Sequence, residues 1–255
     1  MGRFVRVMGW CVANAETKPE TKSVIPKNET TPAPLTMLGF CAVAFCLVLI
    51  AGCGGGGQTR FRMMNAVPDE TNLELLVNGT SVANNVAYGT SNGYQKVKSG
   101  SQQVVIEPSG STSALLTQSV TFTSGTDTTV IASNFSSSIQ ALVLADDNTA
   151  PASGDFKIRI VNSAPGLGPA DVYIVTPATD LNTVSPTLSN LGFDSASGYQ
   201  SLTAGSYEIV LTPAGQKFPA IDTGSLSFSS GQVRTFVGLN SQSGGFSYAM
   251  LQDVN

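Results

Sequence analysis

Residues able to do chemistry are scarce in this 255-residue chain, and their types exclude several kinds of site. The sequence contains no histidine, which removes the commonest general base and the commonest zinc ligand. All 4 cysteines lie at or before Cys53, so the chain beyond that residue can form neither an internal disulfide nor a cysteine metal site. Catalysis there would have to depend on carboxylates, lysine, tyrosine or serine.

One carboxylate stands in a segment that imitates the catalytic loop of aspartic proteases. Asp222 begins an Asp-Thr-Gly-Ser sequence. That chemistry needs a second carboxylate that shares a proton with the first, and the chain has no second loop of this kind. We therefore interpret Asp222 as a turn residue and predict no catalytic residues, with a hydrolase as the remotest alternative.

A second group of carboxylates could offer oxygen ligands to a cation. Asp146, Asp147 and Asp155 lie in a short acidic stretch that also contains proline. Hard oxygen ligands suit Ca²⁺, but the spacing fits no EF-hand loop, and acidic linkers of this kind are usually just solvated. We predict no metal and no cofactor, and calcium at these three carboxylates stays as an alternative.

Two tyrosines occupy the same place in a repeated Gly-Tyr-Gln sequence. Tyr94 and Tyr199 could stack on a sugar or a peptide and so form a bivalent contact site. A tyrosine packed at the corner of a sandwich, with its hydroxyl bonded, would give the same pattern. The structural interpretation is favoured, because repetition alone explains why both copies keep the residue.

An uncharged stretch precedes Cys53. Residues 37–51 contain no charge, and at fifteen residues they are shorter than the roughly 20 of a membrane-spanning helix and close to the upper limit of a signal-peptide core. The sequence before this stretch is unusually long for a signal peptide. Residues 1–52 are nevertheless predicted to be an export signal, and an uncut short anchor is the alternative.

The sequence Ile50-Ala51-Gly52-Cys53 resembles the lipobox of bacterial lipoproteins. The resemblance implies that the signal peptidase reads the first three residues and that Cys53 becomes the lipidated first residue. Two or three acyl chains hold a protein at a bilayer almost permanently. Because glycine rather than aspartate follows the cysteine, we expect the outer membrane or the cell surface, with the glycine-rich residues 53–58 as a flexible tether.

The rest of the chain contains two copies of one unit. The opening segments match at an offset of 97 residues, the central segments at 105 and the closing segments at 107, and each copy closes with an acidic residue near a final Asn. We predict one domain over 59–148, a linker over 149–155 and a second domain over 156–255. The matched segments are Arg60–Pro68 with Lys157–Pro165, Ser91–Gly110 with Ala196–Gly215, and Ser138–Asn148 with Gly245–Asn255.

The composition of both copies is typical of β-structure. Only 12% of the residues are charged, and apolar residues alternate in short runs bounded by Asn-Gly, Ser-Gly and Ala-Gly turns. About seven strands at spacings near ten residues are typical of a sandwich. The predicted fold class is therefore all-β, with two tandem antiparallel β-sandwiches of Ig-like or prealbumin-like type.

Each copy also resembles a known family. The opening Asn-Ala-Val-Pro-Asp at Asn65 and Asn-Ser-Ala-Pro-Gly at Asn162, followed by the two Gly-Tyr-Gln blocks, are similar to the domain of unknown function 4397 family. The resemblance covers nearly all of 59–255 in two copies. It implies a β-sandwich and no established activity, so it assigns no functional residue.

Charge narrows the choice of partners. Beyond Cys53 there are eight Lys or Arg against fourteen Asp or Glu, a formal charge of −6, which disfavours nucleic acid. We predict a lipid-anchored, non-catalytic protein with a structural, adhesive or binding role, whose partner is an envelope polysaccharide or a surface protein. The alternative is a periplasmic or surface solute- or glycan-binding accessory protein, which a ligand groove between the domains would favour.

Overall fold

The structure, a computed structural model, describes residues 58–254, which belong to one compact unit. The predicted signal peptide, Ile50 to Gly52 and Cys53 lie outside the described residues. The described part consists of strands and two short 3₁₀ helices, η1 (Ser136–Ser138) and η2 (Leu181–Thr183). None of its helices is long and apolar enough to cross a membrane. The all-β prediction is confirmed.

The first half of the described chain folds into two facing sheets. The inner sheet has the strand order β4-β1-β7-β8 and the outer sheet the order β3-β2-β5-β6. One hydrophobic core holds side chains of both sheets, such as Phe61 and Ile106, so the two form a sandwich, here called the first sandwich. Its strands are β1 (Gln58–Asn65), β2 (Asn72–Val77), β3 (Thr80–Ala87), β4 (Gln95–Lys98), β5 (Gly100–Pro108), β6 (Leu116–Phe122), β7 (Asp127–Ser133) and β8 (Gln140–Asp146).

The second half repeats this plan and is called the second sandwich. Its inner sheet has the order β12-β9-β16-β17, with β13 also on β9, and its outer sheet the order β11-β10-β14-β15. Phe156, Leu211 and Phe236 share its core. Its strands are β9 (Asp155–Ser163), β10 (Ala170–Val175), β11 (Leu188–Leu191), β12 (Ser195–Ala196), β13 (Gln200–Thr203), β14 (Gly205–Pro213), β15 (Ile221–Phe228), β16 (Val233–Asn240) and β17 (Phe246–Val254).

Each inner sheet departs from the predicted antiparallel pattern at one pair of strands. β1 lies parallel to β7, and β9 lies parallel to β16. Parallel neighbours need a long connection, and here the connecting chain runs through the outer sheet before it returns. All other pairings between named strands are antiparallel within the described residues.

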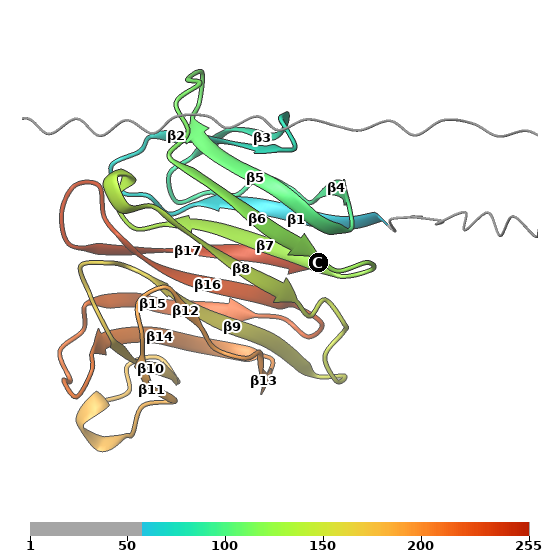
Figure 1. Cartoon of the computed structure of the whole chain (residues 1–255). Coiled ribbons are helices and arrows are strands. Elements are labelled where there is room, and N and C mark those ends of the chain that lie inside the picture. Colours follow the sequence, from blue (N-terminus) through green and yellow to red (C-terminus); the bar gives the residue numbers. More distant parts are fainter. Residues whose placement is uncertain (1–57, 255) are drawn as a thin grey trace, which may run out of the picture. The chain divides into compact units, whose positions relative to one another are not determined.

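The inner sheets of the two sandwiches pack against each other. Met64 and Ile131 of the first sandwich share a separate apolar cluster with Val237 and Leu251 of the second. Figure 1 shows the resulting order, with the outer sheets at opposite ends and the inner sheets between them. Because both faces of each inner sheet are covered, β7, β9 and β16 are buried almost continuously rather than at alternate residues.

The side chains of strand β1 point alternately to the two covered faces of its inner sheet. Phe61 and Met63 belong to the core of the first sandwich. Met64 faces the second sandwich, as does Arg62, whose side chain bonds to β17. The alternation of a strand therefore places an arginine at the junction of the two sandwiches.

The hairpin between β2 and β3 confirms a predicted turn. Asn78 and Gly79 have φ angles of 49° and 76°, as a two-residue type I′ turn requires. The Asn-Gly pair supplies this geometry without strain and sets the pairing of Val77 with Thr80 at the start of the hairpin.

Candidate functional site at the junction of the two sandwiches

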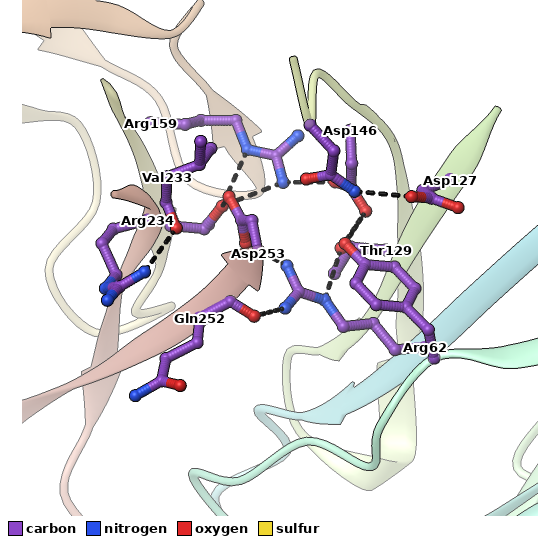
Figure 2. A network of polar contacts seen from close by, with 12 residues as sticks. Arg62, Asp127, Thr129, Asp146, Arg159, Val233, Arg234, Gln252 and Asp253 are labelled. Carbon is purple, nitrogen blue, oxygen red and sulfur yellow. Dashed lines mark hydrogen bonds and ion pairs between the residues drawn. The ribbon is translucent and has the colours of Figure 1, made fainter. Parts of the chain in front are cut away.

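A pair of crossed ion pairs lies between the inner sheets. Arg62 of β1 pairs with Asp253 of β17, and Arg159 of β9 pairs with Asp146 of β8 at 2.6 Å (Figure 2). Both arginine side chains are 3% exposed and both carboxylates 0% exposed. In each pair the arginine comes from one sandwich and the aspartate from the other.

The rest of the Arg62 contacts fix its guanidinium in place. Nη1 donates to the backbone carbonyl of Gln252 at 2.8 Å. Nε donates to Oγ1 of Thr129 at 2.9 Å, and that hydroxyl donates in turn to Asp146 at 2.7 Å. The two ion pairs are thus linked into one network by a threonine of the first sandwich.

The contacts of Arg159 repeat this arrangement with the roles of the two sandwiches exchanged. Nη1 of Arg159 donates to the carbonyl of Ala145 at 3.1 Å, and Nε donates to Thr235 at 3.3 Å. The Thr235 hydroxyl donates to Asp253 at 2.8 Å. Because each contact of one sandwich has its counterpart in the other, the junction has the reciprocal form of a twofold-symmetric dimer interface.

Charge complementarity keeps the buried guanidinium of Arg62 ionised. Burial lowers the pKa of Arg62, but the charge of Asp253 and the hydrogen bond to it raise the pKa more, so that it lies above its ordinary value. A buried ion pair contributes stability only when geometry and hydrogen bonding are this complete. The network therefore determines how the two sandwiches fit together.

Both candidate tyrosines belong to this network. The hydroxyl of Tyr94 donates to Asp146 at 2.7 Å, and that of Tyr199 donates to Asp253 at 2.8 Å. The guanidinium of Arg62 lies 4.7 Å from the centre of the Tyr94 ring, within the range of a cation–π contact. Burial raises the pKa of both phenols above the ordinary value. The two tyrosines thus make the hydrogen bonds expected of the structural interpretation.

The three carboxylates considered for calcium have protein partners. Asp146 is held by the network, Asp147 pairs with Lys157 at 2.8 Å, and Asp155 accepts from Ser201 at 3.3 Å. Hydrogen bonds from Lys157 and Thr149 lower the pKa of Asp147 to about 2. Among the described residues no group of three or more acidic or cysteine side chains is placed to hold a metal ion. This arrangement lends no support to a calcium site.

Asp222 lies at the start of β15, where the pairing with β14 shifts register. Its carboxylate accepts the backbone N–H of Gly224 at 2.8 Å, and Gly224 has a φ of 59°. Aspartate commonly bonds its own backbone two residues on in this way. The structure places Asp222 in a local backbone bend, with no second carboxylate in contact with it among the described residues.

A groove of about 510 Å³ runs beside the network. One wall is the loop Gly89–Tyr94 with Arg62, from the first sandwich, and the other is Tyr248–Gln252 of β17, from the second. The groove thus exists only because the two sandwiches are joined.

Strand β17 presents a free backbone edge to this groove. The carbonyl of Gln252 points off the sheet, since it accepts from Arg62. In an antiparallel ladder alternate residues point the same way, so the N–H and C=O groups of Tyr248 and Met250 also point away from β16. No described residue bonds to these groups.

A side-chain donor in the opposite wall is also without a partner. Oδ1 of Asn92 accepts the N–H of Met63 at 2.6 Å, which fixes the amide. Its Nδ2 is buried and has no hydrogen-bond partner in the described part of the chain. Native structures contain few such atoms, and this one belongs to a residue of the groove wall.

The network residues missed by sequence reasoning are Arg62, Arg159, Thr129, Thr235 and Asp253. The sequence contains a signal for them, because each lies at a matched position of the repeat. Arg62 matches Arg159, Thr129 matches Thr235 in the further segments Thr123–Asn134 and Ser229–Asn240, and Asp253 matches Asp146. What the alignment does not contain is the partner of each residue. That information comes only from the packing of the two inner sheets.

Comparison with known proteins gives one family match. The model of Domain of unknown function (DUF4397) matches residues 59–173. Comparison with curated proteins gave no match.

The solved structures that match this chain include carbohydrate-binding modules. The family CBM26 module CBMbc of Eubacterium rectale Amy13K, in complex with maltoheptaose, is 11% identical with a TM-score of 0.26, over 78% of this chain and 98% of that chain. Family 41 modules from streptococcal virulence factors, described as recognising α-glucan, are 14% identical with a TM-score of 0.25, over 70% and 93% of the two chains.

The family match extends beyond the first sandwich. It ends at Tyr173, inside β10, and so takes in the first sandwich and the opening strands of the second. The chain therefore contains a DUF4397 match at 59–173, while a second copy of that family remains a prediction.

Proposed function

We propose that this protein is a lipid-anchored protein of the bacterial envelope that binds a glycan without catalysing a reaction. The observation that carries the binding role is the groove of about 510 Å³ between the two sandwiches. A ligand groove at a junction of domains is where small molecules and polymers commonly bind. The lipobox-like Ile50 to Cys53 supports the anchor, and a second DUF4397 copy in the second sandwich is part of the proposal.

The polar groups of the groove favour an uncharged, hydroxyl-rich ligand. The free backbone groups of Tyr248 and Met250 offer both donors and acceptors. The one guanidinium in the lining, that of Arg62, is neutralised by Asp253. Sugar hydroxyls both donate and accept hydrogen bonds, so a glycan can satisfy this mixed set without burying a charge.

The experiment is a glycan screen with the full chain purified in detergent, followed by calorimetry on the best ligand. Ser91 lines the groove, so Ser91→Trp should fill it and weaken binding about tenfold or more. Ser113→Trp is the matched control, because Ser113 lies on an exposed loop of the same sandwich. Equal binding by both variants would place the glycan elsewhere and contradict the proposal.

The free edge of β17 favours a second candidate, the addition of an extended polypeptide as a new strand. Such a peptide would protect the amides of Tyr248 and Met250 from hydrogen exchange, because these point into the groove. A neutral glycan would protect at most the few amides that it touches. A peptide-display screen followed by hydrogen exchange on the full chain separates these two functions.

A further inference from the structure

A buried arginine in the second sandwich has no acidic partner. Arg234 of β16 is only 7% exposed. Among the described residues, the one hydrogen bond of its side chain runs from Nη1 to the backbone carbonyl of Val233 at 2.9 Å. No carboxylate of the described residues forms an ion pair with it, although the other buried arginines each have one.

The acidic residue whose charge acts on Arg234 is already engaged. Asp253 bonds to Arg62, Thr235 and Tyr199. Figure 2 shows Arg234 at the margin of the network, with its single dashed line to Val233. Burial lowers the pKa of Arg234, and the charge of Asp253 does not fully offset this.

Arg234 lines a pocket of about 300 Å³ in the second sandwich. Phe228 and Leu226 of β15 and Met250 of β17 give it apolar walls. Gln232 adds a polar group: its side-chain oxygen accepts the N–H of Ser229 at 3.1 Å, which leaves the NH₂ group to donate. Mostly apolar walls with a few polar groups are typical of small-molecule sites.

The fold does not require a charge at this position. Arg234 corresponds to Thr128 in the first sandwich, because Ser229–Asn240 matches Thr123–Asn134 at an offset of 106. Thr128 is equally buried, at 5% exposure. Since a buried cation without a partner is destabilising, its presence in only one of two otherwise equivalent sandwiches points to a ligand.

We propose that this pocket binds a small organic carboxylate. The planar guanidinium of Arg234 has the two parallel donors that match a carboxylate, and the walls of Phe228, Leu226 and Met250 accommodate an apolar or aromatic body. The bound anion neutralises the buried cation, and the NH₂ group of Gln232 donates a further hydrogen bond. Tyr248 and Met250 line both this pocket and the glycan groove, but Arg234 and Gln232 line only the pocket. The inference does not depend on the proposed function.

The test is equilibrium dialysis of the full chain in detergent with radiolabelled benzoate. Unlabelled benzoate should compete for a saturable site, while benzamide, its uncharged analogue, should compete about tenfold or more weakly. Arg234→Gln should weaken benzoate binding by a similar factor. Arg60→Gln is the matched control, because Arg60 is also on an inner sheet but is 51% exposed and ion-paired, and it should bind as the wild type does.

Three results would overturn the proposal: no saturable benzoate binding by the wild type, equal competition by benzamide, or unchanged binding by Arg234→Gln. The benzamide comparison uses only the wild-type chain, so it decides the question even if Arg234→Gln fails to fold. Ser91→Trp, which fills the glycan groove, should bind benzoate normally. Failure of one site is thereby distinguished from failure of the other.

Discussion

Arg62 and Asp253 form a buried ion pair although 191 positions separate them in the sequence. The equivalent pair, Arg159 with Asp146, spans only 13 positions because it crosses the link between the sandwiches. Despite this difference in separation, each pair joins an arginine of one sandwich to an aspartate of the other. The two ion pairs that hold the junction are thus equivalent in structure although their separations along the chain differ.

Breaking one crossed pair should destabilise the whole described unit. Asp253→Ala leaves the guanidinium of Arg62 buried and unpaired, so we expect the free energy of unfolding to fall by about 3–5 kcal/mol. Urea denaturation measures this. Replacement of both partners, Arg62→Met with Asp253→Leu, removes the unpaired charge and should recover part of the loss. Recovery is incomplete because the hydroxyls of Thr235 and Tyr199 also lose their acceptor.

The control for that experiment is the exposed ion pair of Arg60, which lies on β1 as Arg62 does. Arg60 pairs with Asp127, but its side chain is 51% exposed, so Arg60→Ala should cost no more than about 1 kcal/mol. An equal loss for Arg60→Ala and Asp253→Ala would show that burial does not set the strength of these pairs.

The pair between Lys157 and Asp147 should give a small acid-dependent contribution. The pKa of Asp147 is lowered from 3.8 to about 2 by hydrogen bonds from Lys157 and Thr149. A carboxylate with a lowered folded-state pKa contributes stability above its unfolded pKa and loses it as the pH falls. The stability difference between wild type and Asp147→Asn should therefore be constant above about pH 5 and be largely lost by about pH 2.

The size of that difference is limited by solvent. Asp147 is 51% exposed, so we expect less than about 1 kcal/mol. Urea denaturation at several pH values measures it. A difference that persists unchanged at pH 2 would contradict the assignment to this carboxylate.

The buried guanidinium of Arg234 should lower the free energy of unfolding of the protein. Arg234→Met removes an unpaired buried cation while keeping the apolar length of the side chain, so the free energy of unfolding should rise by about 1–3 kcal/mol. Thermal or urea denaturation without added anions measures the change. Destabilisation instead would show that the guanidinium has a structural role.

The proposed anchor predicts a covalent modification at Cys53. Labelled palmitate should be incorporated into the wild-type protein and not into Cys53→Ser, because the thiol accepts the lipid. Cys46→Ser, a change in the uncharged stretch before the cut, should leave the label in place. Label that survives in Cys53→Ser would refute the lipobox interpretation.

Much of the architecture is predictable from the sequence because it is local or repeated. The alternation in β2 and the Asn78-Gly79 turn fix a hairpin without any knowledge of the rest of the fold. The matched segments predict that both halves share one plan, and the strand orders agree. Tyr94 and Tyr199 were also predicted to be equivalent, and both donate to an aspartate of their own sandwich.

The junction was not predictable for a specific physical reason. Arg62 and Asp146 occur in the same repeat, as do Arg159 and Asp253, so the sequence is equally compatible with pairing within each sandwich. The choice of the crossed partners depends on how two sheet faces pack, which is a long-range property. The parallel pairing of β1 with β7 and the isolation of Arg234 depend on such long-range packing too.

The reciprocal junction has a consequence for how the two sandwiches can vary. In an assembly of two identical chains any substitution appears twice, once on each side of the axis. In this single chain Thr128 and Arg234 occupy matched positions and differ, and the loop before Tyr94 forms a groove wall together with only one strand of the other half. Because the two sandwiches belong to one chain, each can have a binding site that the other lacks, although the two pack together in a nearly symmetric way.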